Sequence, residues 1–179
     1  MTKLFLDVLN DPQKKLWGKL GVLSQNSCVL AGGTAIAMQI GHRISEDFDL
    51  FVPETVSRAT RENAYELMSE IERVPIDDNY QLTILSRDGL KLTVVSHPYA
   101  PLYKLIKTDG LSLFDLRDLA SNKANTIGRR GTWRDYVDIY FLLKEQIVTL
   151  NQMMKETKLR FKEEFDQRRF LSQLTYTKD

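Results

Sequence analysis

The spacing of apolar and polar positions predicts a mixed α/β arrangement in the first half of the chain. In order, it indicates a helix, a buried strand, a second helix and a second strand, over residues 12–23, 27–31, 34–40 and 47–51. Asp11-Pro12 is a typical helix start, with Asp11 as the cap and Pro12 in the first turn. Gly41 is placed to end the second helix in a left-handed conformation. Strict alternation makes residues 47–51 a strand with one polar face.

The later patterns predict more sheet and then a change to helices. Residues 56–74 read as an amphipathic helix, and a turn at Asp88-Gly89 joins two runs, 81–85 and 90–95, into a hairpin. Helical patterns follow over residues 116–126 and 133–144 and after Thr149. We therefore expect an α+β fold, with a mixed sheet and flanking helices over residues 1–110 and a C-terminal helical region over residues 111–179.

Composition narrows the class of protein. The 179 residues are 42% hydrophobic and 27% charged, which is ordinary for a soluble globular protein. The single cysteine, Cys28, lies in an apolar run, so we expect a small core residue and a reducing, cytoplasmic setting. With two histidines and one cysteine, a zinc site is not expected. The longest uncharged apolar stretch, near residues 28–40, is too short to span a membrane.

Charge is unevenly distributed along the chain. Residues 1–100 carry 10 basic and 13 acidic side chains, and residues 101–179 carry 15 and 11, which gives −3 and +4. The positive second half permits a phosphate-bearing partner.

One arrangement carries chemistry: a strand, Gly32-Gly33, a short helix, and a strand with Asp47 and Asp49. Glycines after a strand let the backbone approach a phosphate, and N–H groups at the next helix start point at the anion. Thr34 can add a hydroxyl donor. Side chains alternate along a strand, so both carboxylates project from one face, ~6–7 Å apart. Magnesium suits this pair, because it takes one or two carboxylates with phosphate oxygens and water.

These residues resemble the signature of the nucleotidyltransferase superfamily, with 13 residues between Gly33 and Asp47. The sequence is more specifically similar to the AbiEii/AbiGii-type toxin family of bacterial nucleotidyltransferases. The segments that carry the resemblance, within about residues 28–145, are Ala31–Ala35, Gly41–Phe51, Leu119–Ala124, Arg129–Thr132 and Arg134–Leu142.

The resemblance implies a Mg²⁺-dependent transfer of a nucleotide from a nucleoside triphosphate to an acceptor, with RNA as the expected acceptor. It further implies a toxin of a toxin–antitoxin or phage-defence system, with an antitoxin protein as a possible partner. Asp47 and Asp49 would hold metal, Lys123 would neutralise phosphate charge, and Asp135 would orient or deprotonate the acceptor. The nucleotide-binding set would be Gly32, Gly33, Thr34, Arg43 and Ser45, with Arg43 and Ser45 at the rim of the phosphate site.

One departure keeps a second hypothesis open. The family places a third carboxylate on a neighbouring strand, and this position falls on Thr93 in a run that has no acid. The alternative is therefore a nucleotide- or partner-binding protein that retains the fold and has lost turnover. A third acid near Asp47 and Asp49 would favour the enzyme. Arg129-Arg130 fits either a solvated loop or a contact to nucleic acid, and Trp17 and Trp133 are expected in the core.

Overall fold

A computed structural model describes residues 3–175 of the chain. The chain divides into two compact units. The first comprises residues 1–98 and 105–114, and the second residues 99–104 and 115–179. The chain thus enters the second unit briefly at residues 99–104 before it returns to the first.

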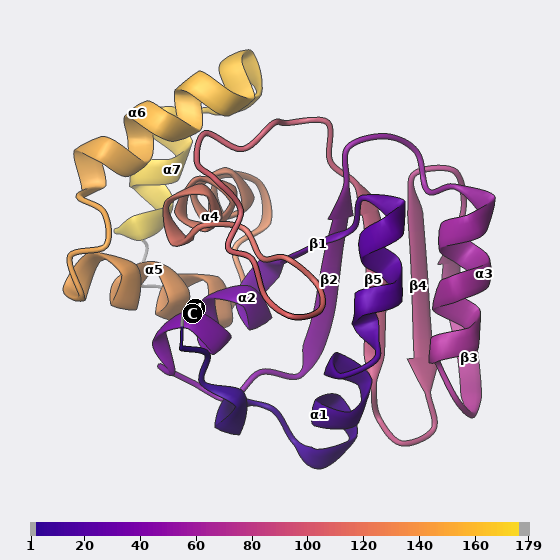
Figure 1. Cartoon of the computed structure of the whole chain (residues 1–179). Coiled ribbons are helices and arrows are strands. Elements are labelled where there is room, and N and C mark those ends of the chain that lie inside the picture. Colours follow the sequence, from indigo (N-terminus) through magenta and orange to yellow (C-terminus); the bar gives the residue numbers. More distant parts are fainter. Residues whose placement is uncertain (1–2, 176–179) are drawn as a thin grey trace. The chain divides into compact units, whose positions relative to one another are not determined.

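The first unit is built on a mixed sheet. Within residues 3–175, its five strands lie in the order β1-β2-β5-β4-β3 (Figure 1). The central neighbours β2 and β5 are parallel, and the other pairs are antiparallel. The strands are β1 (Val29–Ala31), β2 (Asp47–Val52), β3 (Ile71–Asp77), β4 (Gln81–Ser86) and β5 (Lys91–Ser96). The sheet and the helices confirm the predicted α+β class.

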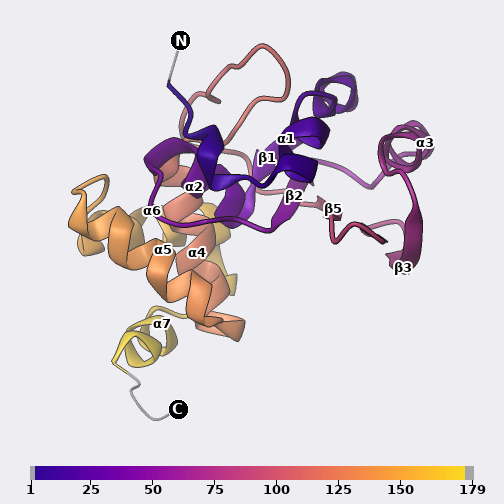
Figure 2. The same ribbon diagram turned by 90° about the horizontal axis from the view of Figure 1, so that it is seen from below.

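Helices of the first unit cover the apolar face of this sheet. They are η1 (Leu6–Val8), α1 (Asp11–Trp17), η2 (Leu20–Asn26), α2 (Gly32–Ile40) and α3 (Arg58–Leu67), where η denotes a 3-10 helix. Figures 1 and 2 show α1 and α3 on the same side of the sheet. Trp17 stacks on the fully buried Phe48, with ring centroids 6.5 Å apart. The even-numbered side chains of β2 therefore form the core, as the alternation predicts.

Several predicted boundaries move for local reasons. Asn10, not Asp11, caps α1. Its side chain accepts a hydrogen bond from Gln13 N, and its own N–H donates to Gln13 Oε1. Ser27, expected in a strand, has φ 58 and ends η2 instead. Gly41 does end α2 in the left-handed conformation, with φ 67.

Strand β3 replaces the end of a predicted helix. Helix α3 stops at Leu67, and Glu70 has φ 51, a left-handed turn that redirects the chain. Ile71 to Asp77 then pairs irregularly with β4 at the edge of the sheet. An edge position tolerates Pro75, which has no N–H to donate. Pairing with β4, the next strand in the chain, thus overrides the helical periodicity of residues 71–74.

The second unit is helical and is organised around α4. Helix α4 contacts α5, α6 and α7, which are arranged about it in Figure 1. The elements are α4 (Leu116–Arg130), α5 (Trp133–Lys144), α6 (Leu150–Phe161), η3 (Lys162–Glu164) and α7 (Gln167–Leu174). The side chain of Asp115 caps α4 and the side chain of Thr149 caps α6. The helical pattern predicted after Asp115 is confirmed.

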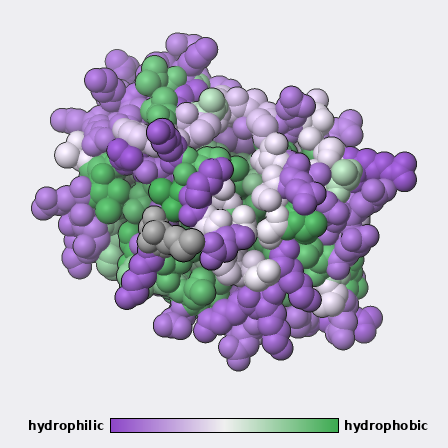
Figure 3. All heavy atoms as spheres, viewed as in Figure 1, coloured by the Kyte–Doolittle hydropathy of each residue, from purple (hydrophilic) through white to green (hydrophobic). Residues whose placement is uncertain are grey.

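Within residues 3–175, no helix combines the length and apolarity needed to cross a membrane. On the face drawn in Figure 3, hydrophilic residues surround small hydrophobic areas.

Candidate active site

The two carboxylates project from one side of β2. Along this strand, Asp47 and Asp49 are partly buried, whereas Phe48 and Leu50 are fully buried on the opposite side. The local alternation therefore places both acids on one face and anchors the strand through its apolar face. We call the face with Asp47 and Asp49 the carboxylate face.

Gly32 lies directly against Asp49. It has φ +64, and a Cβ built on it would lie 2.4 Å from Asp49 Oδ2 and 3.0 Å from Asp49 Cβ. Ala31, the last residue of β1, is the register partner of Asp49. The glycine thus serves two purposes: it allows the left-handed turn into α2, and it leaves space for the carboxylate.

Gly32→Ala is expected to impair activity more than stability. The positive φ alone costs about 1–2 kcal/mol for a residue with a Cβ, and the clash additionally displaces Asp49. Gly89→Ala is the matched control, since Gly89 has φ +82 but no neighbour within 4 Å. We expect both variants to lose thermal stability, whereas only Gly32→Ala loses nucleotide turnover. Full turnover in Gly32→Ala would contradict this arrangement.

Thr34 and Ser45 hold the connector between α2 and β2. Both are buried, at 2% and 3% exposure, and their hydroxyl oxygens lie 2.6 Å apart. Thr34 Oγ1 donates to the carbonyl oxygen of Asp47, so the Ser45 hydroxyl is the donor between the two side chains. Ser45 N in turn donates to Val8 O at 2.9 Å. The Thr34 hydroxyl thus holds the start of β2 in this structure, and its expected role toward a phosphate stays a prediction.

The backbone at the start of α2 remains the anion-binding candidate. Ala31 occupies the cap position of this helix. Its methyl side chain cannot accept from the first N–H groups, which an anion could satisfy. Arg43 lies in the connector, where its Nη1 donates to Ile44 O at 3.0 Å. The structure therefore brings Gly32, Thr34, Ser45 and both aspartates into one region of the first unit.

The neighbouring strand β5 contributes Thr93, which the sequence analysis identified, and Lys91, which it did not. In the parallel pair, Lys91 is the register partner of Asp47, and Thr93 is the partner of Asp49. Lys91 Nζ lies 3.3 Å from Asp47 Oδ2, and Thr93 is buried at 8% exposure. The position expected for a third carboxylate is thus occupied by a hydroxyl, beside a lysine. Alternation in residues 90–95 puts Lys91 and Thr93 on one face, and the family resemblance placed this strand beside β2, but the pattern alone does not show the register that pairs Lys91 with Asp47.

Asp47 and Asp49 on the carboxylate face could hold a magnesium ion. Mg²⁺ needs only one or two protein carboxylates when phosphate oxygens and water complete its coordination. Across residues 3–175, no group of three or more His, Cys, Asp or Glu side chains could hold a metal ion. A site with a full set of protein ligands is therefore not formed in the described part of the chain, and Asp47 and Asp49 are the candidates for a shared ion with bound nucleotide.

Lys123 and Asp135 form a buried ion cluster inside the second unit. Lys123 Nζ lies 2.7 Å from Asp135 Oδ1 and 2.7 Å from Asp138 Oδ2. Asp135 Oδ2 also accepts from Thr132 N at 2.9 Å and from Thr132 Oγ1 at 2.8 Å, which caps α5. Asp138 is fully buried and was not among the predicted site residues. Burial alone would raise the pKa of Asp135, but the Lys123 charge and the hydrogen bonds from Lys123 and Thr132 hold it below the usual 3.8.

This shift gives a pH-dependent contribution to stability. Because the folded pKa of Asp135 lies below its unfolded value, its contribution is present above about pH 4 and is lost as the pH falls through the folded pKa. Asp135→Asn should therefore be less stable than wild type at pH 7, with a difference that shrinks on acidification. Urea unfolding at several pH values measures this difference, with the exposed Glu145→Gln as a control. A difference that grows toward low pH would contradict the assignment.

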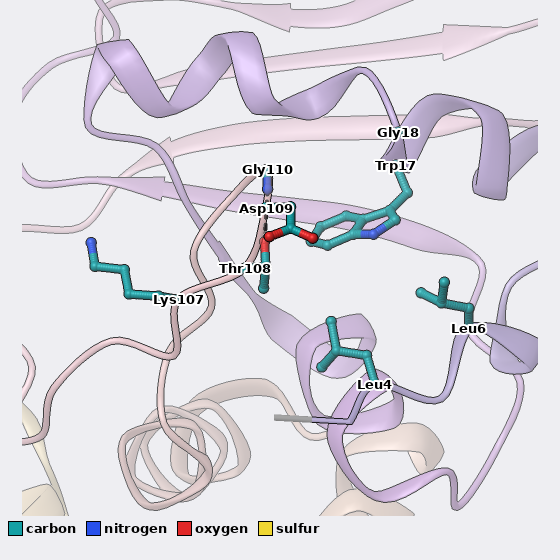
Figure 4. A pocket seen from close by; sticks show the side chains of 8 residues that line it. All are labelled: Leu4, Leu6, Trp17, Gly18, Lys107, Thr108, Asp109 and Gly110. Atoms are coloured by element: carbon teal, nitrogen blue, oxygen red, sulfur yellow. Dashed lines mark hydrogen bonds between the residues drawn. The ribbon is translucent and has the colours of Figure 1, made fainter. Parts of the chain in front are cut away.

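A separate cavity in the first unit lies away from these residues. Its volume is about 370 Å³, and its lining is Leu4, Leu6, Trp17, Gly18, Lys107, Thr108, Asp109 and Gly110. Figure 4 shows Trp17, Leu4 and Leu6 around the opening, with the Lys107 side chain directed away from the indole. The Thr108 hydroxyl already accepts from Gly110 N at 3.1 Å and donates to Leu111 O at 2.8 Å. None of the predicted site residues lines this cavity.

Two single-residue predictions have opposite outcomes. Cys28 is a core residue, as expected, and its burial raises the pKa of the thiol to about 12, which excludes a reactive thiolate. Trp133 was expected in the core and is instead 79% exposed at the start of α5. The helical pattern around Trp133 is real, but it does not determine which face the indole occupies.

Comparisons with known proteins identify similar sequences. Residues 21–85, which include Gly32, Asp47 and Asp49, match the model of the family described as nucleotidyl transferase AbiEii toxin, type IV toxin–antitoxin system. An uncharacterized protein of Aquifex aeolicus (strain VF5) is 28% identical over 144 residues, which cover 76% of this chain and 68% of that protein.

Solved structures share the fold. A putative nucleotidyltransferase of Helicobacter pylori superposes with a TM-score of 0.61 at 16% identity, over 92% of this chain and 91% of that chain. The nucleotidyltransferase toxin MenT4 of Mycobacterium tuberculosis gives 0.54 at 16% identity, over 82% of this chain and 61% of that chain. At these identities the structures establish the fold alone, and the predicted nucleotidyltransferase-like architecture is confirmed.

Proposed function

We propose that this chain, whose residues 21–85 match the model of the AbiEii nucleotidyl transferase toxin family, transfers a nucleoside monophosphate from a nucleoside triphosphate to an acceptor hydroxyl. The observation that carries this proposal is the placement of Asp49 against Gly32, beside Asp47 on one sheet face. Carboxylates next to a backbone anion site are the groups that metal-assisted phosphoryl chemistry requires.

Each residue has a role in the proposed reaction. Asp47 and Asp49 would hold Mg²⁺, and the backbone N–H groups at the start of α2 would bind the triphosphate. Bound Mg²⁺ would supply polarisation of the α-phosphate. The acceptor oxygen forms a bond to the α-phosphorus, the bond from that phosphorus to the bridging oxygen breaks, and pyrophosphate leaves. Lys123 is proposed to neutralise phosphate charge, and Asp135 to orient the acceptor hydroxyl and to take its proton; both lie in the second unit. Thr34 and Ser45 position the start of β2 beside the triphosphate, and they remain proposed members of the nucleotide-binding set with Gly33 and Arg43.

Release of pyrophosphate tests the reaction class. With Mg²⁺ and total bacterial RNA, wild type should release pyrophosphate and leave the α-phosphate on the acceptor. Release of inorganic phosphate from the γ position would instead indicate hydrolysis, and appearance of the γ-phosphate on the acceptor would indicate phosphoryl transfer. Either result would contradict the proposal.

Exposed aromatic and basic side chains on α5 support RNA as the acceptor. Trp133 and Tyr140 are 79% and 58% exposed, and seven residues on one helix place them on one face, roughly 10 Å apart. Arg134 and Lys144 are exposed on the same helix, and Arg130 precedes it. Lys144 Nζ lies 5.8 Å from the centre of the Tyr140 ring. Bases stack on exposed aromatic rings, and cations attract the phosphates.

A double variant tests this acceptor surface. Trp133→Ala with Tyr140→Ala should weaken binding of fluorescently labelled RNA by roughly 30-fold or more, since two stacked bases contribute about 1–3 kcal/mol each. Leu159→Ala is the matched control, because Leu159 is 64% exposed on α6 without aromatic character. Equal RNA affinity in the double variant and the control would exclude this surface, and nucleotide binding should be unchanged in both.

Thr93 favours a second candidate function. A hydroxyl beside Asp49, where a third carboxylate is expected, would weaken activation of the acceptor. The chain would then bind nucleotide, or a partner, without turnover. Magnesium-dependent nucleotide binding without pyrophosphate release, in the presence of RNA, would identify this case.

We also propose a cellular role from the description of the matched family. A toxin of a type IV toxin–antitoxin system would act with a separate antitoxin as its genetic partner. We propose the cytoplasm as its compartment, because nucleoside triphosphates and RNA are available there.

A further inference from the structure

A positively charged side chain, that of Lys91, lies beside the carboxylate pair. Lys91 and Asp47 are register partners on parallel strands, and Lys91 Nζ lies 3.3 Å from Asp47 Oδ2. Thr93, two residues after Lys91 on β5, is the register partner of Asp49 and contributes a neutral hydroxyl. The strand that faces the pair therefore adds one positive charge and no negative charge.

The charge balance limits how many divalent cations the face can hold. Asp47, Asp49 and Lys91 sum to −1, so one divalent ion brings the group to +1. Two ions, about 3.5–4 Å apart in two-metal sites, would bring it to +3 before any phosphate binds. Each would also lie near an ammonium group, with strong mutual repulsion at such distances.

Lys91 is placed to act on the nucleotide as well as on Asp47. The side chains of Lys91 and Asp47 are 38% and 33% exposed, so their ion pair adds little to folding stability. An ammonium group has three hydrogens, and the bond to Asp47 uses one. The others can bind phosphate oxygens, which are negatively charged acceptors.

We propose that Lys91 is a further residue of the nucleotide site, and that its ammonium takes the place of a second divalent cation. The inference rests on the proposed function, because it assumes that Asp47 and Asp49 hold metal with a nucleoside triphosphate. The carboxylate face then holds one divalent ion, and Lys91 positions Asp47 and binds the triphosphate.

Electron paramagnetic resonance of bound Mn²⁺ tests how many divalent ions the carboxylate face holds, and it needs no turnover. The full chain is measured with excess Mn²⁺ and α,β-methylene ATP, which cannot release pyrophosphate. Wild type should give the spectrum of an isolated Mn²⁺ ion. The double variant Lys91→Gln with Thr93→Asp should give the spin-coupled spectrum of two close Mn²⁺ ions. Lys91→Gln alone should lower the affinity for the analogue about 10-fold and raise the affinity for Mn²⁺, whereas Lys91→Arg should retain both.

The outcomes separate this inference from the proposed function. A spin-coupled spectrum in wild type would overturn the role of Lys91 and leave the transferase proposal intact. Unchanged Mn²⁺ and nucleotide affinities in Lys91→Gln would also overturn it, even if the double variant fails to fold. No Mn²⁺ bound to wild type would overturn both, because the metal would then have no site at Asp47 and Asp49.

Discussion

Replacing Asp49 by asparagine is expected to lower nucleotidyl transfer by about 1,000-fold or more, since a metal that polarises phosphate contributes several kcal/mol to the transition state. Asparagine keeps the size of the side chain beside Gly32, so the fold should be retained. Asp47→Asn should behave similarly, and the double variant should lose metal-dependent nucleotide binding. Isothermal titration with a nucleoside triphosphate, with and without Mg²⁺, measures this loss.

Glu46→Gln is the matched control for Asp49→Asn. Glu46 is exposed and precedes Asp47 in the chain, so its replacement removes one negative charge nearby without removing a proposed ligand. We expect less than about a fivefold change, since interactions between exposed charges amount to about 0.2–1 kcal/mol in water. Equal losses in Glu46→Gln and Asp49→Asn would mean that net charge, rather than metal binding, governs activity.

Arg160→Met should destabilise the second unit more than any exposed substitution. Arg160 and Asp118 are buried, with Arg160 Nη1 3.5 Å from Asp118 Oδ1 and 2.8 Å from Asp118 O. Asp118 in turn accepts from Leu102 N and Tyr103 N, at 2.8 and 3.0 Å. Arg160 also donates to Ala100 O at 3.2 Å, so the pair holds residues 99–104 on the helical unit.

The expected cost of Arg160→Met is about 3–5 kcal/mol, because the change leaves a buried carboxylate without its cation. Burial already raises the pKa of Asp118, against the backbone hydrogen bonds and the Arg160 charge. Lys158→Met on the same helix is the control. Its ion pair with Glu163 spans 3.4 Å with exposed side chains, so we expect a change within about 0.5 kcal/mol. Urea unfolding measures both, and similar losses would contradict this reading of the buried pair.

Local patterns were sufficient for the features that depend on neighbours in the chain. Alternation alone places Asp47 and Asp49 on one face of β2. Gly41 ends α2 because only a few residues tolerate its backbone conformation. Gly32 was expected to allow a close backbone approach, and the structure adds that its missing Cβ leaves room for Asp49.

Features that depend on strand pairing and on side-chain burial could not be predicted from these patterns. Lys91 becomes part of the site only because β5 lies parallel to β2 in a particular register. β3 forms at the sheet edge although the periodicity of residues 71–74 favours a helix. Asp138 differs from other helical aspartates only through burial against Lys123. Trp133 shows the reverse case, since an apolar residue in a helical pattern lies on the exposed face.

Transfer of label from nucleoside triphosphate to RNA is the most direct test of the account. Purified wild type and Asp49→Asn would each be incubated with Mg²⁺, total bacterial RNA and one of the four α-labelled nucleoside triphosphates at a time. The account predicts that wild type attaches label to RNA from at least one nucleotide and that Asp49→Asn attaches almost none. Label on RNA at equal levels in both proteins, or no label from any nucleotide, would contradict the claim that this carboxylate site is a nucleotidyltransferase active site.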